Sequence, residues 1–215
     1  MRMKIWMLLC VFSTLSAFAQ DMKSVFVSMP DSVAPLLTKV NKEDCVDFLA
    51  YDMKAEVKNR FGGTTELKVL TDDYLFLQIT KNSSMEMKLL PVNDSTKVVC
   101  MVKTVCASAC DSEVHFYTSD WTQKLSTADF LSRPAGDVFF LPADSVDEEY
   151  RLIRKEANVH LKKASLSKED GSLTFIYMTP DYLNKENKEK LEPIYGRSRL
   201  YLNGKKESSD KKIKG

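Results

Sequence analysis

Cysteines are the side chains in this sequence best suited to covalent chemistry. Five occur in 215 residues: Cys10, Cys45, Cys100, Cys106 and Cys110. Thiol oxidoreductases place a Cys-x-x-Cys motif at a helix start, where the helix dipole lowers the pKa of the attacking thiol. Here Cys106 and Cys110 are separated by three residues and follow a predicted strand. We therefore interpret this pair as a structural disulfide rather than a redox site.

Acid–base and metal chemistry have few candidates. His115 and His160 are the only histidines, and neither has metal-ligand spacing to the cysteines or lies near a nucleophile motif. Acidic pairs such as 72–73 and 148–149 are explained by turns and helix starts, although a glycosidase would need two such carboxylates across a cleft. We predict no catalytic residue, no metal ligand and no cofactor, and keep a glycan-directed hydrolase using loop carboxylates as an alternative.

Aromatic side chains in the predicted strands are the candidates for ligand binding. They are Tyr74, Phe76, Phe116, Tyr117, Phe175 and Tyr177. Aromatic residues in strands usually pack in a core, and when one sheet face stays open they form binding surfaces instead. The hypothesis is an aromatic sheet face that binds a protein or a glycan.

The first nineteen residues have the pattern of a secretory signal peptide. Arg2 and Lys4 are followed by a mostly apolar stretch, and Ala17-Phe18-Ala19 forms a small-x-small cleavage site. The apolar stretch is about 14 residues long, shorter than the roughly 20 that a membrane-spanning helix needs. We expect cleavage near Ala19, no transmembrane segment, and a mature protein in the periplasm or at the cell exterior.

Four cysteines then remain in an oxidising compartment, which favours two disulfides. Cys106 and Cys110 are close enough to pair locally, which leaves Cys45 and Cys100 for a second bond. In the chain-entropy model the short loop contributes about 2 kcal/mol and the long loop about 4 kcal/mol.

The net charge gives no reason to expect a nucleic-acid or membrane partner. The formal charge is +1. Loss of Arg2 and Lys4 with the leader changes it to 1 − 2 = −1. A nearly neutral chain has no global field to attract polyanions. The exception is the lysine-rich tail 205–215, a solvated terminus or a contact for an anionic surface.

Periodicity predicts two helices followed by an antiparallel meander. Residues 21–30 are expected to be extended. A first helix begins at the caps Asp31 and Ser32, and a second begins at Asn41. Period-two alternation then predicts strands around 66–69, 74–79, 85–89, 97–106 and 114–118, with the strand 97–106 apolar on both faces and therefore central. In the strand 85–89, the apolar residues alternate with Glu86 and Lys88, which are expected on the wetter face. The helices should cover one face of the sheet.

A second, smaller unit is expected after a linker. A capping box at Ser145 and Glu148 opens a helix, and Asp170-Gly171 joins two strands in a hairpin. A short helix over 184–191 and a strand over 199–202 follow. The fold class is α+β, with a signal peptide at 1–19, units at 20–120 and 144–204, a linker at 121–143 and a tail at 205–215.

Three serines lie in an Asp-Ser-small or Asp-Ser-Thr context: Ser32, Ser95 and Ser145. The pattern is similar to O-glycosylation sites of exported proteins from gut Bacteroidetes. Helix capping and turns explain the same residues.

Three segments carry a wider resemblance: Phe26 to Phe61, Leu89 to Ser112 and Ser172 to Leu183. They resemble an uncharacterised family of exported Bacteroidales proteins, which implies the periplasm or cell exterior but no functional residue. The layout of helices and meander is also similar to that of β-lactamase inhibitor proteins. The resulting hypothesis is a non-enzymatic binding or inhibitor-like envelope protein, and the third alternative is a structural or assembly factor of the envelope.

Overall fold

The computed structural model describes residues 20–93, 96–131, 148, 151–152, 155, 160–191 and 197–201. Its helices are α1 (Met22–Ser28), α2 (Lys39–Ala50) and α4 (Lys185–Leu191), with short 3-10 turns η1 (Thr127–Asp129) and η4 (Thr179–Tyr182). Its strands are β1 (Glu56–Lys58), β2 (Thr64–Leu70), β3 (Tyr74–Thr80), β4 (Ser83–Pro91), β5 (Lys97–Cys106), β6 (Cys110–Thr118), β7 (Lys124–Leu125), β8 (Lys162–Leu166), β9 (Ser172–Tyr177) and β10 (Arg197–Tyr201). The α+β class is confirmed.

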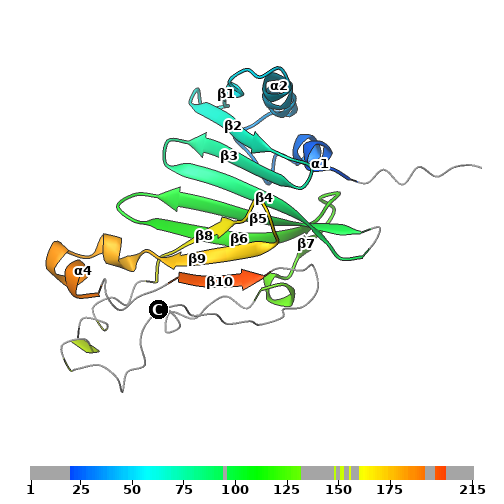
Figure 1. The fold of residues 1–215 in the computed structure, drawn as a ribbon. Coiled ribbons are helices and arrows are strands. Elements are labelled where there is room, and N and C mark those ends of the chain that lie inside the picture. The colour runs from blue at the N-terminus through cyan, green and yellow to red at the C-terminus, as the bar shows by residue number, and fades with distance from the viewer. Residues whose placement is uncertain are drawn as a thin grey trace, which may run out of the picture.

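Seven strands form one antiparallel meander in the order β1-β2-β3-β4-β5-β6-β7, as Figure 1 shows. Each strand pairs with its sequence neighbour, because the turns between them are too short for any other connection. The predicted meander and the central position of β5 are confirmed. Three further strands form a small antiparallel sheet in the order β10-β9-β8.

The alternation along the strands creates a separate core on each face of the large sheet. On one face, Leu75, Leu77 and Met101 pack with the buried side chains of α1 and α2. On the other face, Cys100 and Phe116 pack against the small sheet. Because β5 contributes to both cores, it is covered on two sides, and each large side chain that it buries is worth about 1.5–3 kcal/mol.

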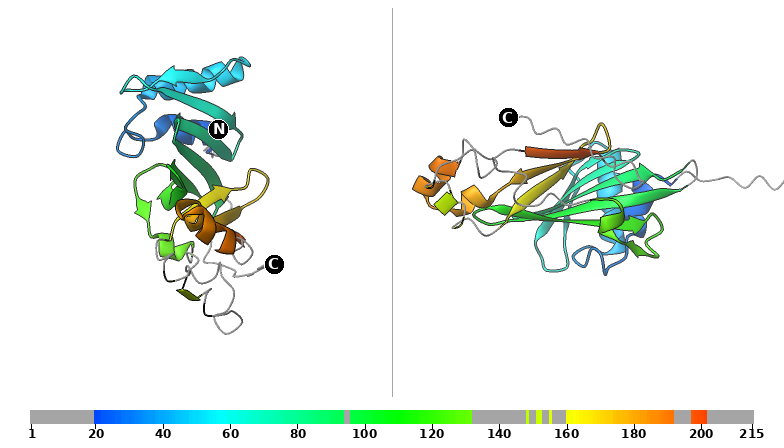
Figure 2. Two further views of the ribbon diagram at one scale, coloured as in Figure 1. Left: turned by 90° about the vertical axis from the view of Figure 1, so that its left-hand side faces the viewer. Right: turned by 90° about the horizontal axis from the view of Figure 1, so that it is seen from below.

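The small sheet lies across the meander where β8 contacts β4, β5 and β6 (Figures 1 and 2). This packing corrects the expectation that Glu86 and Lys88 lie on a wetter face, because both are buried beneath it. The opening of a second unit at Ser145, most of the C-terminal half of the linker and the tail 205–215 lie outside the described residues. The division into two units with a linker stays a prediction.

The segment predicted to be extended forms helix α1 instead. Asp21 is its N-cap, and the Asp21 carboxylate accepts the backbone N–H of Ser24 at 2.8 Å. Met22, Val25 and Phe26 form its buried stripe. The i, i+3, i+4 spacing of these residues favours a helix, which pattern analysis of 21–30 missed.

The helix expected to begin at Asp31 and Ser32 does not form, and residues 31–36 make turns. Helix α2 begins at a capping box in which Thr38 and Asn41 exchange side-chain and backbone hydrogen bonds. The preceding carbonyls are held by lysines: Lys42 Nζ donates to Met29, and Lys103 Nζ donates to Val33 at 2.7 Å. These side-chain donors replace the hydrogen bonds that a helix would have supplied.

Candidate ligand pocket between the two sheets

The candidate site is a pocket of about 380 Å³ where the small sheet leaves part of the large sheet uncovered. The end of the β3–β4 hairpin, the end of β5 and the strand β8 surround it. Its lining residues are Phe76, Gln78, Lys81, Asn82, Ser83, Ser84, Glu86, Thr104, Cys106, Lys163 and Ser165. The volume falls in the range of small-molecule binding sites.

Strand pairing places the floor of the pocket on one face of the large sheet. Phe76 lies opposite Glu86, Gln78 lies opposite Ser84, and Ser84 in turn lies opposite Thr104 on the next strand. Residues that pair directly across strands point to the same face. The face that carries the buried core thus becomes polar toward this end, with Phe76 as its half-buried aromatic ring.

Glu86 is the buried carboxylate of the floor. Its Oε2 accepts the backbone N–H of Leu166 at 2.7 Å and the Tyr74 hydroxyl at 3.4 Å. Burial raises the pKa of Glu86 above its ordinary value, while the Leu166 and Tyr74 hydrogen bonds and the charge of Lys163 act in the opposite direction. The carboxylate therefore joins the two sheets by accepting hydrogen bonds.

The wall of the pocket is β8, whose outer edge is fastened to the large sheet by side chains. The N–H groups of Lys162, Ala164 and Leu166 point away from β9. They are accepted by Asp111 Oδ1 at 3.0 Å, Ser112 Oγ at 2.9 Å and Glu86 Oε2. This arrangement satisfies backbone donors that an edge strand would otherwise leave unpaired. The side chains of Lys163 and Ser165 lie on the opposite face of β8 from those of Ala164 and Leu166. Both residues are half-buried at the pocket.

Cys106 and Cys110 form a disulfide at the rim, where β5 turns into β6. The two residues also pair across the hairpin, with their Cα atoms 4.0 Å apart. The bond closes the hairpin end that carries Asp111 and Ser112, the acceptors for β8.

The expected second disulfide is wrong, because Cys45 and Cys100 are free thiols. Cys45 lies in the core beneath α2, whereas Cys100 lies in the core on the opposite face of the sheet. Period two along β5 turns the Cys100 side chain away from the helices. Burial raises the pKa of Cys45 to about 11 and raises that of Cys100 also, so both thiols are inert.

Most of the aromatic candidates do not form an open face. Tyr74, Phe116, Phe175 and Tyr177 are buried between the two sheets, which corrects the expectation of a broad exposed surface for these four. Tyr117 is half-buried on the helix side of the sheet, with its ring centroid 5.3 Å from that of Trp121. The structure brings only Phe76 of the six to the pocket.

Each of the two histidines lies against an acidic or phenolic side chain. His115 Nε2 is 3.1 Å from Glu113 Oε2, and burial is the main cause that lowers the pKa of His115. His160 Nδ1 is 3.4 Å from the Tyr177 hydroxyl. No three His, Cys, Asp or Glu side chains in the described ranges gather closely enough to hold a metal ion. Among the same residues, no helix has the length and apolarity that a membrane crossing needs.

Of the three candidate glycosylation sites, Ser32 is the one that lies within the described residues. Ser32 is exposed in a turn between α1 and α2, next to Asp31, which pairs with Arg60. Ser95 and Ser145 lie outside the described residues. Modification of all three serines stays a prediction.

Comparisons with known proteins give a family and a fold. A family model described as a protein of unknown function, DUF3256, matches residues 14–206. A solved structure described as a domain of an uncharacterized protein from Porphyromonas gingivalis W83 matches with a TM-score of 0.77 and 24% identity, covering 90% of this chain and 100% of that chain. At that identity the likeness shows the fold alone. No protein with a curated description matches the chain. Because the family model spans nearly the whole sequence, the chain belongs to the DUF3256 family, whose function is unknown.

Proposed function

We propose that the protein is exported and acts as a non-catalytic binding protein of the cell envelope, with a pocket that takes a sugar unit of a glycan. The observation that carries the proposal is the half-buried Phe76 ring set among amide, hydroxyl and ammonium groups in a pocket of about 380 Å³. The C–H groups of a sugar ring pack on an aromatic face, while its hydroxyls need polar partners around them.

The lining offers such partners. Ser84 and Ser165 supply hydroxyls, and Asn82 supplies an exposed amide at the mouth. The Gln78 amide is already used, since Nε2 donates to the carbonyls of Thr80 and Ser83 at 2.8 and 3.0 Å. Gln78 therefore shapes the hairpin end, and the serines and Asn82 provide the hydrogen bonds to ligand.

A hydrolase is a less well supported function for this pocket than a binding protein. A glycosidase uses two carboxyl groups about 5–10 Å apart. Glu86 is the single carboxylate among the described lining residues, and its Oε2 already accepts two hydrogen bonds that join the sheets. A carboxylate whose oxygen is engaged in these hydrogen bonds is poorly placed to act as a general acid.

The proposal of export rests on the leader, with its basic residues, apolar stretch and Ala17-Phe18-Ala19 cleavage site. The disulfide between Cys106 and Cys110 supports it, because disulfides persist in oxidising compartments. Envelope glycans are present in that compartment.

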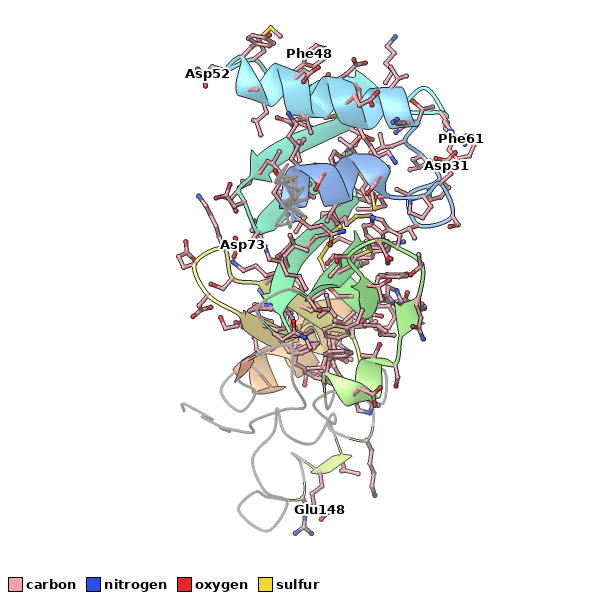
Figure 3. The ribbon with its side chains drawn as sticks, turned by 90° about the vertical axis from the view of Figure 1, so that its right-hand side faces the viewer. Asp31, Phe48, Asp52, Phe61, Asp73 and Glu148 are labelled. Carbon is pink, nitrogen blue, oxygen red and sulfur yellow. A yellow bond between two sulfur atoms is a disulfide. The ribbon has the colours of Figure 1, made fainter. Side chains whose placement is uncertain are left out.

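A protein partner is the second candidate, favoured by apolar side chains exposed near α2. Phe61 is 86% exposed at the β1–β2 turn, where Asn59 Oδ1 accepts its N–H. Figure 3 shows Phe61 and Asp31 near one end of α2 and Asp52 near the other. Tyr51 and Met53 are also exposed beside Asp52. An inhibitor-like role would use such a surface.

The test compares Phe76→Leu with Phe61→Leu in binding to a panel of neutral, amino and acidic oligosaccharides. Phe76→Leu keeps apolar packing but removes the aromatic face, so saccharide binding should weaken about tenfold, while Phe61→Leu should leave it unchanged. Absence of saccharide binding to the unaltered protein would refute the proposal. Capture of an envelope protein that depends on Phe61 and not on Phe76 would favour the second candidate.

A further inference from the structure

The charges of the pocket indicate which kind of sugar it takes, an inference that rests on the proposed function. Its charged lining residues in the described chain are Lys81, Lys163 and Glu86. Lys81 is exposed at the hairpin turn, Lys163 is half-buried on β8, and Glu86 is buried in the floor. Glu86 is occupied by Leu166 and Tyr74, and burial raises its pKa, which disfavours its negative form. The accessible part of the pocket is therefore positive.

Lys163 differs from the other partly or fully buried lysines around the large sheet. Those on α2 and the large sheet each have an oxygen partner: Lys42 with the Met29 carbonyl, Lys97 with the Gln20 carbonyl, Lys103 with the Val33 carbonyl, and Lys88 with Asp73 and the Lys168 carbonyl at 2.9 Å each. Among the described residues, Lys163 Nζ has no hydrogen bond and no ion pair, although its charge acts on Glu86 over a longer distance.

Because the Lys163 ammonium has no oxygen partner among the described residues, it is available to an acceptor on a ligand. Uncharged sugars supply only hydroxyls, whereas a carboxylate or sulfate supplies charged acceptors, which form the stronger hydrogen bonds. The ammonium of Lys163 lies in the same pocket as Phe76, so one sugar can contact both.

We propose that the pocket selects an acidic sugar, with Lys163 pairing to a carboxylate or sulfate on the ring that packs against Phe76. Lys81, at the mouth, attracts the same charge during approach. The preference for acidic over neutral sugars comes from these two lysines, and the hydroxyl and aromatic contacts are common to both kinds of ligand.

The experiment uses probes that differ in one group. Methyl β-glucuronide, methyl β-glucoside and methyl β-glucoside 6-sulfate are titrated into isotope-labelled protein, and amide shifts of β3, β4 and β8 are followed by NMR. At low salt we expect an acidic probe to bind at least about fivefold more tightly than the glucoside. The difference should shrink in 0.5 M salt, because the pairing is partly exposed. Comparison of the two acidic probes tells whether carboxylate or sulfate is preferred.

The variant Lys163→Gln should remove most of the preference for the acidic probes, because Lys163 makes the pairing contact while Lys81 acts only during approach. Lys168→Gln is the matched control, because Lys168 is an exposed lysine in the β8–β9 turn outside the pocket lining, and it should keep the preference. Unchanged melting temperatures show that both variants fold.

Two results overturn the inference. Equal binding of glucoside and both acidic probes, or an undiminished preference in Lys163→Gln, refutes selection of acidic sugars while the glycan-binding function stands. If no probe shifts the pocket amides and the oligosaccharide panel is also negative, the proposed function fails and the inference fails with it.

Discussion

Glu86 shows how a single buried charge can hold two sheets together at a cost. A carboxylate taken out of water is stabilised only when hydrogen bonds replace its hydration. Leu166 N–H and the Tyr74 hydroxyl supply two of these bonds to Oε2. Burial nevertheless raises the pKa of Glu86, so the replacement is incomplete. Glu86 serves as a hydrogen-bond acceptor for β8, and its negative charge destabilises the folded state.

This reasoning predicts a pH dependence with a definite sign. Because the pKa of Glu86 is higher in the folded protein than its ordinary 4.5, the stability linked to it is fully present below pH 4.5. That stability is lost as the pH rises through the raised pKa. Glu86→Gln keeps an acceptor without a charge, so its free energy of unfolding, relative to that of the unaltered protein, should increase from pH 4 to pH 7.

Denaturant unfolding of both proteins across this range measures the effect. Glu86→Ala is the control: it also lacks the titrating carboxyl, so its stability relative to the unaltered protein should change with pH in the same direction, but without the acceptor it should be about 3 kcal/mol less stable than Glu86→Gln at both pH values. A difference between the Gln variant and the unaltered protein that does not change with pH would contradict the prediction.

At the scale of elements, β8 is an edge strand whose backbone is completed by side chains. Ser112 is buried and bonds both the Ala164 N–H and the Thr104 hydroxyl, the latter at 2.8 Å. Asp111 makes the equivalent contact to Lys162 at an exposed position. Both acceptors lie next to the Cys106–Cys110 hairpin end, so the disulfide and the seating of β8 are linked.

Ser112→Ala should therefore destabilise far more than Asp111→Ala. The first leaves the Ala164 N–H buried without an acceptor, at a cost of about 2 kcal/mol, while water can replace Asp111 at a cost of about 0.5 kcal/mol or less. Hydrogen exchange provides a local measure, since the Ala164 amide should exchange faster in Ser112→Ala. Equal effects of the two variants would show that β8 is held by apolar packing alone.

The strands were predictable from sequence because their signal is local. The packing of the small sheet on one face of the large sheet was not predictable in this way. Alternation identified β2 to β6, and the strand that is apolar on both faces, β5, is central. The position of Glu86 depends on the small sheet, which is distant in sequence, so alternation placed it on the wet side. Phe76 was named from sequence, whereas Lys163 was missed because only the packing of β8 brings it to the pocket.

The prediction of a helix beginning at Asp31 and Ser32 was wrong for a different reason. Asp31 and Ser32 have good capping chemistry, but Thr38 has a complete capping box, and Lys42 and Lys103 bind the carbonyls of Met29 and Val33. Which of the two acceptable caps begins a helix is decided by side-chain hydrogen-bond donors from other parts of the fold. Pattern alone cannot weigh those donors.

At the scale of the whole molecule, β5 contributes buried side chains to the cores on both faces of the large sheet. Buried side chains of β5 and β6 pack with those of β8 and β9. Helices α1 and α2 cover the opposite face. This packing shapes the pocket before any ligand binds.

Export and modification are tested together on protein purified from the cells that make it. N-terminal sequencing should begin at Gln20, as expected for cleavage after Ala19. Mass spectrometry should find a glycan on Ser32, which is exposed, with the Ser32→Ala variant as control. An intact leader in the mature protein would refute export, and an unmodified Ser32 peptide would refute glycosylation at that site.

The fastening of β8 also bears on how copies of this protein behave when crowded. A strand margin with unpaired donors can recruit a strand from another molecule and so seed fibres. Along β8 those donors are taken by Asp111, Ser112 and Glu86. Three side chains thus protect this edge from polymerisation.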